Sequence, residues 1–144
     1  MSSVQELLIV DLDKRRTGFA EVGPGAITVR SPVCGDEVTV EARLDADRVS
    51  SLAWHGKGCT VSMASASALA GLAPGLTREE FASTYESFAA LVHGPPPSDD
   101  LEREFDELPL LGDAVAFAGI GRIPLRAGCA SLAWRALERV LAAE

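Results

Sequence analysis

Cysteine and histidine are scarce in this chain, and long apolar stretches are absent. Its 144 residues include three cysteines and two histidines. The cysteines form no Cys-x-x-Cys pair, so a thioredoxin-type redox pair has no support, and their odd number argues against a disulfide framework. No apolar run reaches the roughly 18 to 20 residues that cross a bilayer, and the N-terminus lacks the basic start of a secretory signal. We therefore expect no membrane association and a cytoplasmic location.

Basic residues are also in the minority. Lysine and arginine together number 13 against 21 aspartates and glutamates, which gives a net charge of −8. Phosphate binding depends on clustered Lys and Arg, so nucleic-acid binding is not expected. The remaining composition, 47% hydrophobic and 24% charged, is that of an ordinary globular protein. The length fits a single domain, residues 1–144, with a core of its own.

The patterns in the first part of the chain predict strands after a short helix. An amphipathic helix is expected from Val4 to about Lys14. Three strand-like runs follow, and the connector between the last two is short enough for a hairpin. We therefore expect an α+β fold, with a three-stranded antiparallel sheet and helices packed on it. The predicted strands cover residues 26–30, 37–44 and 49–54.

The rest of the chain is typical of helices. One helix is expected from Cys59 to about Leu72, and a capping box from Thr77 to Glu80 predicts the start of the next. That second helix carries an apolar stripe that indicates a core face, made of Phe81, Tyr85, Phe88, Leu91 and Val92. The later predictions are a stiff connector at 95–100, an acidic helix at 101–107, a helix at 113–118 and a last helix from about Cys129.

Each of the three cysteines lies beside residues that form turns or begin helices. Gly58 delivers Cys59 to the start of a helix, where open N–H groups and the helix dipole favour an anion. Cys129 is expected at the N-terminus of the last helix in the same way, and Cys34 lies in the connection between the first two strands. The alternative is that each is a small buried apolar residue, as most free cysteines are.

Three thiols and a nearby carboxylate also suggest a zinc site. Zinc favours tetrahedral sites made of thiolate, imidazole and carboxylate, and Asp36 follows Cys34 by two residues across a glycine. A hard oxygen among soft sulfurs is the ligand easiest to exchange, so such a site suits chemistry more than structural stapling. Its excess negative charge needs compensation, which two helix N-termini and Arg126 can provide.

The predicted strand order bears on whether these residues meet. Cys34 lies in the connection between the first two strands, whereas Cys59 follows the third. We expect a simple up-down-up meander to place these two connections at opposite ends of the sheet, unless the first is a wider crossover. The spacing alone therefore leaves both a metal site and separate buried cysteines open.

Three sequence blocks resemble the signature blocks of the IscU/NifU N-terminal family. They are Pro-Val-Cys-Gly-Asp at 32–36, Gly-Cys-Thr-Val-Ser-Met-Ala-Ser-Ala-Ser at 58–67 and Cys-Ala-Ser-Leu-Ala-Trp-Arg-Ala-Leu at 129–137. They occur in the family's order across most of the chain, and the resemblance implies the IscU/NifU-like, SufE-like fold. The SufU branch matches best, because Gly128 replaces the scaffold's histidine, Arg126 matches that branch's arginine and the long insert at 75–110 is present.

This resemblance implies a zinc-dependent sulfurtransferase of iron-sulfur cluster assembly. The implied zinc ligands are Cys34, Asp36, Cys59 and Cys129, and the implied acceptor of persulfide sulfur is Cys34. The implied partners are a SufS-like, pyridoxal-phosphate cysteine desulfurase and other iron-sulfur assembly proteins. Arg126 is a second catalytic candidate, which stabilises the thiolate or contacts the partner. Residues 11–18 depart from the Asp-His-Tyr-Lys-Asn-Pro type segment of the family, which indicates different N-terminal contacts with a desulfurase.

Two other functions remain alternatives. The same four ligands suit a scaffold that assembles a 2Fe-2S cluster, with iron in place of zinc, and a metal-stabilised adaptor without transfer chemistry would need no free thiolate. The other notable side chains have structural interpretations. His55 and His93 are expected at the surface, Trp54 and Trp134 in the core or at a partner surface, and Met63 in packing.

Overall fold

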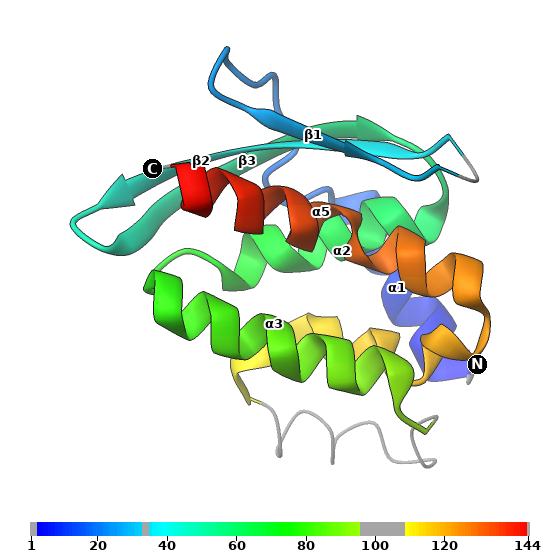
Figure 1. Cartoon of the computed structure of the whole chain (residues 1–144). Helices are drawn as coiled ribbons and strands as arrows, with labels where there is room; N and C mark the ends of the chain where they lie inside the picture. Colours follow the sequence, from blue (N-terminus) through cyan, green and yellow to red (C-terminus); the bar gives the residue numbers. More distant parts are fainter. Residues whose placement is uncertain (1–2, 33–34, 96–108, 144) are drawn as a thin grey trace.

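In the computed structural model, the helices lie against one side of a small sheet (Figure 1). The structure describes residues 3–32, 35–95 and 109–143. No helix within these ranges is long and apolar enough to cross a membrane. The elements, in chain order, are α1 (Ser3–Arg15), β1 (Ile27–Arg30), β2 (Glu37–Asp45), β3 (Arg48–Lys57), α2 (Thr60–Leu72), α3 (Arg78–His93), the 3₁₀ helices η1 (Pro109–Phe117) and η2 (Ile120–Arg122), and α5 (Pro124–Ala143).

The sheet is an antiparallel meander in the order β1-β2-β3, which confirms the predicted α+β class and the hairpin between the last two strands. Arg30 at the end of β1 pairs with Glu37, which pairs in turn with Lys57 at the end of β3. The β1–β2 connection and the exit of β3 therefore lie at the same end of the sheet. The expectation of opposite ends was wrong, because the first and third strands of a meander run in the same direction.

One face of the sheet is apolar because alternate strand residues point to the same side. In β2, Val38 and Val40 are fully buried, and in β3 Trp54 is as well. Helix α5 packs against this face, as Figure 1 shows, while the opposite face carries the polar strand residues. The sheet thereby fixes where the start of β2 and the end of β3 lie relative to α5.

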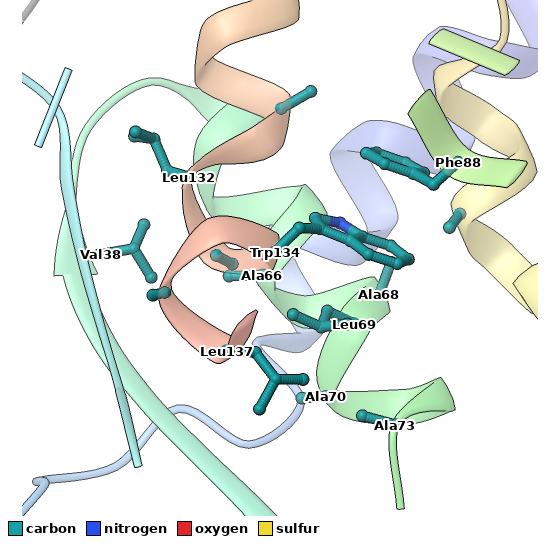
Figure 2. Close-up of a cluster of buried hydrophobic side chains, with 14 of the residues drawn as sticks. Val38, Ala66, Ala68, Leu69, Ala70, Ala73, Phe88, Leu132, Trp134 and Leu137 are labelled. Carbon is teal, nitrogen blue, oxygen red and sulfur yellow. The ribbon is translucent and has the colours of Figure 1, made fainter. Parts of the chain in front are cut away.

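Helix α2 lies at the centre of the helical layer. All nine of its residues from 62 to 70 are buried, so the helix has no solvent-exposed side over this stretch. A helix that is apolar all round belongs inside a core, and its Ala and Ser side chains let α1 and α5 approach closely. Figure 2 shows Ala66 and Leu69 of this helix close to Trp134 and Leu137 of α5.

Trp134 is the centre of the aromatic part of the core. Its ring stacks on Phe88 with centroids 4.1 Å apart and an interplanar angle of 8° (Figure 2). Its Nε1 donates to the Oγ of Ser65, and that hydroxyl donates to the carbonyl of Ala130. Trp54 and Trp134, which were expected either in the core or at a partner surface, both lie in the core, and the expected packing role of Met63 is confirmed. Each of the three is at most 1% exposed.

Most predicted element boundaries hold to within a few residues. The N-terminal helix is confirmed as α1, the helix after Cys59 as α2, and the capping box as the start of α3, where Thr77 and Glu80 bond reciprocally. The segment predicted as a helix at 113–118 is instead the 3₁₀ helix η1, interrupted at Gly112, whose φ of 50° and ψ of −133° do not fit a helix. The acidic helix at 101–107 and nearly all of the connector at 95–100 lie outside the described residues.

The last helix begins earlier than predicted. Helix α5 begins at Pro124, whereas the sequence suggested a start near Cys129. Proline suits the first helical position because its fixed φ matches the helix and its missing N–H is not needed there. Cys129 therefore lies in the second turn of α5, and the expectation that it occupies a helix N-terminus was wrong.

Candidate metal centre

Three of the predicted ligand residues meet at the end of the sheet where β2 begins and β3 ends. Asp36 precedes β2, Cys59 precedes α2, and Cys129 lies within α5. One ligand atom from each of the three lies within 4.8 Å of the others. The residues come from three distant parts of the sequence, so this proximity is created by the fold. Cys34, the fourth predicted ligand, lies outside the described residues.

The Asp36 carboxylate is the best anchored of the three groups. Its Oδ2 accepts hydrogen bonds from the Ser62 hydroxyl at 2.7 Å and from the Cys59 backbone N–H at 3.1 Å. Asp36 is only 7% exposed, and burial alone would raise the pKa of its carboxyl group. Donation from Ser62 and Cys59 outweighs burial and holds this pKa below its usual range, so the group is an anion at neutral pH.

The donors around this carboxylate are neutral. Among the described residues, no Lys or Arg forms an ion pair with Asp36, although two basic side chains lie at the same end of the sheet. Arg30 and Lys57 instead pair with Glu37, at 2.7 Å and 3.9 Å. A buried carboxylate that is ionised without a cationic partner, beside two thiols, is a donor set that fits a divalent metal such as zinc.

Cys59 contributes both its backbone and its thiol to the centre. It is the N-cap of α2 with an extended backbone, φ −71° and ψ 166°, and its side chain forms no capping hydrogen bond. Its Sγ lies 3.5 Å from the Ser62 hydroxyl. This residue is exposed, whereas Cys129 is only 3% exposed, so the centre has an open side and a buried side.

Gly58 makes room for the carboxylate. Its φ is +154°, and a Cβ built there would lie 2.5 Å from the Cγ of Asp36. Any larger residue would therefore both strain the backbone and push the carboxylate away from its donors. The glycine before Cys59 is a spatial requirement of the centre.

The prediction that two helix N-termini and Arg126 compensate the negative charge of the centre needs correction. Of the two helix N-termini that were expected at the centre, only that of α2 is present, because α5 begins at Pro124. Arg126 is exposed in the first turn of α5. It lines a cavity of about 280 Å³ with Gln5 and Arg122. In the described part of the chain, its side chain has no hydrogen bond or ion pair to Asp36, Cys59 or Cys129.

Sequence reasoning missed Ser62. It is 1% exposed and contacts both Asp36 and Cys59, yet within its sequence block only Cys59 was predicted to have a function. The available signal was its position three residues after Cys59, which places both on one side of a helix start. The two histidines were predicted correctly, since both are exposed, and neither belongs to the group of three ligand residues.

This chain has a small α+β fold, and one carboxylate and two thiols meet at one end of its sheet. These features define a class of proteins with a metal-thiolate centre. Its sequence identifies the family. The profile of the NifU-like N terminal domain matches residues 12–130, so the chain belongs to that family.

Two curated relatives cover most of the chain. The zinc-dependent sulfurtransferase SufU of Bacillus subtilis is 34% identical over 118 residues, which are 82% of this chain and 75% of the relative. The iron-sulfur cluster assembly scaffold protein IscU of Streptococcus pyogenes serotype M1 is 30% identical over 135 residues, 93% of this chain and 80% of the relative. The resemblance to IscU and SufU read from the three sequence blocks is confirmed.

The fold is shared with a solved structure. The N-terminal part of a NifU-like protein from Brucella abortus superposes with a TM-score of 0.76 at 21% identity, covering 95% of this chain and 93% of the other. The sheet with its helical layer is therefore the fold of this family.

Proposed function

We propose that this chain is a zinc-dependent sulfurtransferase of iron-sulfur cluster assembly. In this proposal it acts as a single domain in the cytoplasm and accepts persulfide sulfur on Cys34 from a SufS-like cysteine desulfurase that carries pyridoxal phosphate. The observation that carries the proposal is the gathering of Asp36, Cys59 and Cys129 within 4.8 Å. Membership of the family and the similarity to a zinc-dependent SufU give further support.

The donor set agrees with zinc as the resident metal. Asp36, Cys59 and Cys129 supply one oxygen and two sulfurs, and Cys34, in the adjacent connection, would complete the four ligands of a tetrahedral site. When bound, the ion would keep the cysteine ligands ionised and therefore nucleophilic. The open side at Cys59 is where a partner would approach, because Cys129 is buried.

The proposed step is a thiol–persulfide exchange. The Cys34 thiolate attacks the outer sulfur of the persulfide on the desulfurase cysteine. A new sulfur–sulfur bond forms on Cys34 while the bond within the donor persulfide breaks, and the desulfurase cysteine leaves as a thiolate. The sulfane sulfur and its charge move together, so the step needs no external oxidant or reductant.

Arg126 is proposed as the second functional side chain. It is exposed on α5, three residues before Cys129, and it shares its cavity with Arg122. In this position it would contact an acidic group of the docked partner more readily than the buried thiol. Arg126→Ala should then raise the desulfurase concentration needed for half-maximal stimulation while leaving zinc content unchanged.

A desulfurase assay tests the proposal. Zinc content is measured first, and the turnover of a cysteine desulfurase is then followed with wild-type protein and with Cys34→Ala. We expect about one zinc per chain and a turnover that rises with wild type but not with the variant. A wild-type protein that leaves turnover unchanged would contradict the transfer function for that desulfurase.

The scaffold function is the second candidate, favoured by the 30% identity to an IscU scaffold. Anaerobic addition of iron and sulfide should then give a visible 2Fe-2S chromophore that depends on Asp36, Cys59 and Cys129. For a metal-stabilised adaptor, Cys34→Ala should lower the free energy of unfolding without changing desulfurase turnover. These two readouts separate the alternatives from sulfur transfer.

A further inference from the structure

We propose that Ser62 is a positioning residue of the metal centre, which fixes the Asp36 carboxylate in the orientation that a metal ion requires. The inference rests on the metal-binding part of the proposed function and extends it to a side chain that is not itself a ligand. It follows from the burial of Ser62 and from the two groups that its hydroxyl contacts.

Among the described residues, the hydroxyl of Ser62 contacts side chains of the centre only. The residue is 1% exposed, and its Oγ donates to the Oδ2 of Asp36 at 2.7 Å. The same oxygen lies 3.5 Å from the Sγ of Cys59. A single buried hydroxyl therefore contacts two of the three ligand residues that the structure brings together.

Other buried serines of α2 have different partners. Ser65 bonds to the Ala130 carbonyl and accepts from Trp134, while Ser67 accepts from the backbone N–H of Thr17. These two serines connect α2 to α5 and to the loop after α1. Within residues 3–32, 35–95 and 109–143, the Ser62 side chain connects α2 only to the Asp36 carboxylate, so its removal should affect the centre more than the fold.

The hydrogen bond from Ser62 persists when a metal binds. The thiols of Cys59 and Cys129 lose their protons when the sulfurs become ligands. The Ser62 hydroxyl and the Cys59 N–H keep their protons. They therefore hold Oδ2 in both states, and a carboxylate held at one oxygen presents the other in a fixed direction.

Hydrogen-bond partners of this kind have a measurable effect on metal affinity. Removing such a partner of a ligand lowers metal affinity by about 10- to 100-fold. Ser62→Ala should therefore weaken zinc binding by about that factor, while Ser67→Ala, a matched loss of a buried hydroxyl on the same helix, should leave it within about twofold of wild type. The effect should pass through Asp36, so adding Ser62→Ala to Asp36→Ala should produce little further loss.

The experiment measures zinc dissociation constants by competition with a chromophoric chelator and the visible spectrum of the cobalt(II)-loaded protein. It uses wild type, Ser62→Ala, Ser67→Ala, Asp36→Ala and the double variant Ser62→Ala/Asp36→Ala. Ser62→Thr and Ser62→Val are added as a pair of nearly equal volume, in which only threonine keeps the hydroxyl. Thermal unfolding of each metal-free variant separates loss of fold from loss of affinity.

We expect Ser62→Ala and Ser62→Val to lose affinity and to shift the cobalt spectrum, and Ser62→Thr to bind at least tenfold more tightly than Ser62→Val. The inference is overturned if Ser62→Ala binds zinc as Ser67→Ala does, if threonine and valine bind equally, or if the effects of Ser62→Ala and Asp36→Ala simply add. A wild-type chain that binds neither metal overturns it together with the zinc site. If wild type fails to stimulate a desulfurase while the affinity pattern holds, the transfer function is lost and the role of Ser62 stands.

Discussion

Replacing Gly58 by alanine should disable the metal centre while leaving most of the fold intact. The added Cβ would lie 2.5 Å from the Cγ of Asp36 and 2.8 Å from its Oδ1. Since carbon atoms in contact prefer about 3.5 to 4.0 Å, the carboxylate must retreat by roughly 1 Å. Its hydrogen bonds to Ser62 and to the Cys59 N–H, 2.7 and 3.1 Å long, would not survive such a shift.

The size of the effect follows from these contacts. A hydrogen bond to a charged group contributes about 1.5 to 3 kcal/mol, part of which the displaced carboxylate regains from water. A net loss of only about 1.4 kcal/mol would already weaken zinc binding tenfold. The positive φ adds strain of about 1 to 3 kcal/mol, so the unfolding temperature should also fall by several degrees.

Zinc titration beside thermal unfolding tests this reasoning, with Gly75→Ala as the matched control. Gly75 also has a positive φ, +96°, but a Cβ there has no neighbour within 4 Å. Gly75→Ala should therefore lower the melting temperature and bind zinc as wild type does. If Gly58→Ala matches this control in zinc affinity, crowding of Asp36 is not the reason for the glycine, and the geometry assigned to the centre is wrong.

Three further predictions concern the core, a helix cap and the metal. Trp134→Ala should lower the free energy of unfolding by about 3 to 5 kcal/mol in urea denaturation, with a smaller loss for Trp134→Phe, because the ring stacks on Phe88. The Thr77 N–H and hydroxyl lower the pKa of Glu80. The contribution of ionised Glu80 to folding stability is therefore present above the ordinary glutamate pKa and disappears as the pH falls through the lowered pKa. Glu80→Gln should then make the melting temperature fall less steeply at acid pH. Zinc at 100 times its dissociation constant should stabilise wild type by about 2.7 kcal/mol, and Cys129→Ala should abolish most of the thermal shift.

The ligand residues of the centre could be predicted from the sequence, but the contacts among them could not. Asp36, Cys59 and Cys129 are the chemically reactive members of three recognisable blocks, so their identities can be read from the sequence. Ser62 belongs to one of these blocks, but the sequence alone does not distinguish a serine that only fills space in a buried helix, as alanine does, from a serine that bonds to a distant partner. Its partner Asp36 lies 26 residues away, and only the meander brings the two together.

Element types were predictable from periodicity, whereas two boundaries were decided by tertiary contacts. Residues 124–128 contain a proline and a glycine, which favour a loop, yet α5 includes them because Ala127 and Cys129 are buried against the rest of the molecule. The segment at η1 is apolar enough for an α-helix, but Gly112 breaks it and Gln5 donates to the carbonyls of Ala116 and Ala118. Burial outweighs local propensity at the start of α5, whereas at η1 a glycine and the hydrogen bonds from Gln5 act together.

The start of β2 separates two neighbouring carboxylates by the alternation of the strand. Glu37 lies on the polar face, where Arg30 and Lys57 neutralise it. Asp36 lies on the opposite side with the buried Val38, where its donors are a hydroxyl and an amide. A shift of register by one residue would exchange the two environments and place Asp36 on the polar face beside the two cations. The pairing of Glu37 with Arg30 and with Lys57 therefore does more than close the sheet. It keeps both cations away from Asp36 and leaves that anion to be balanced by a metal.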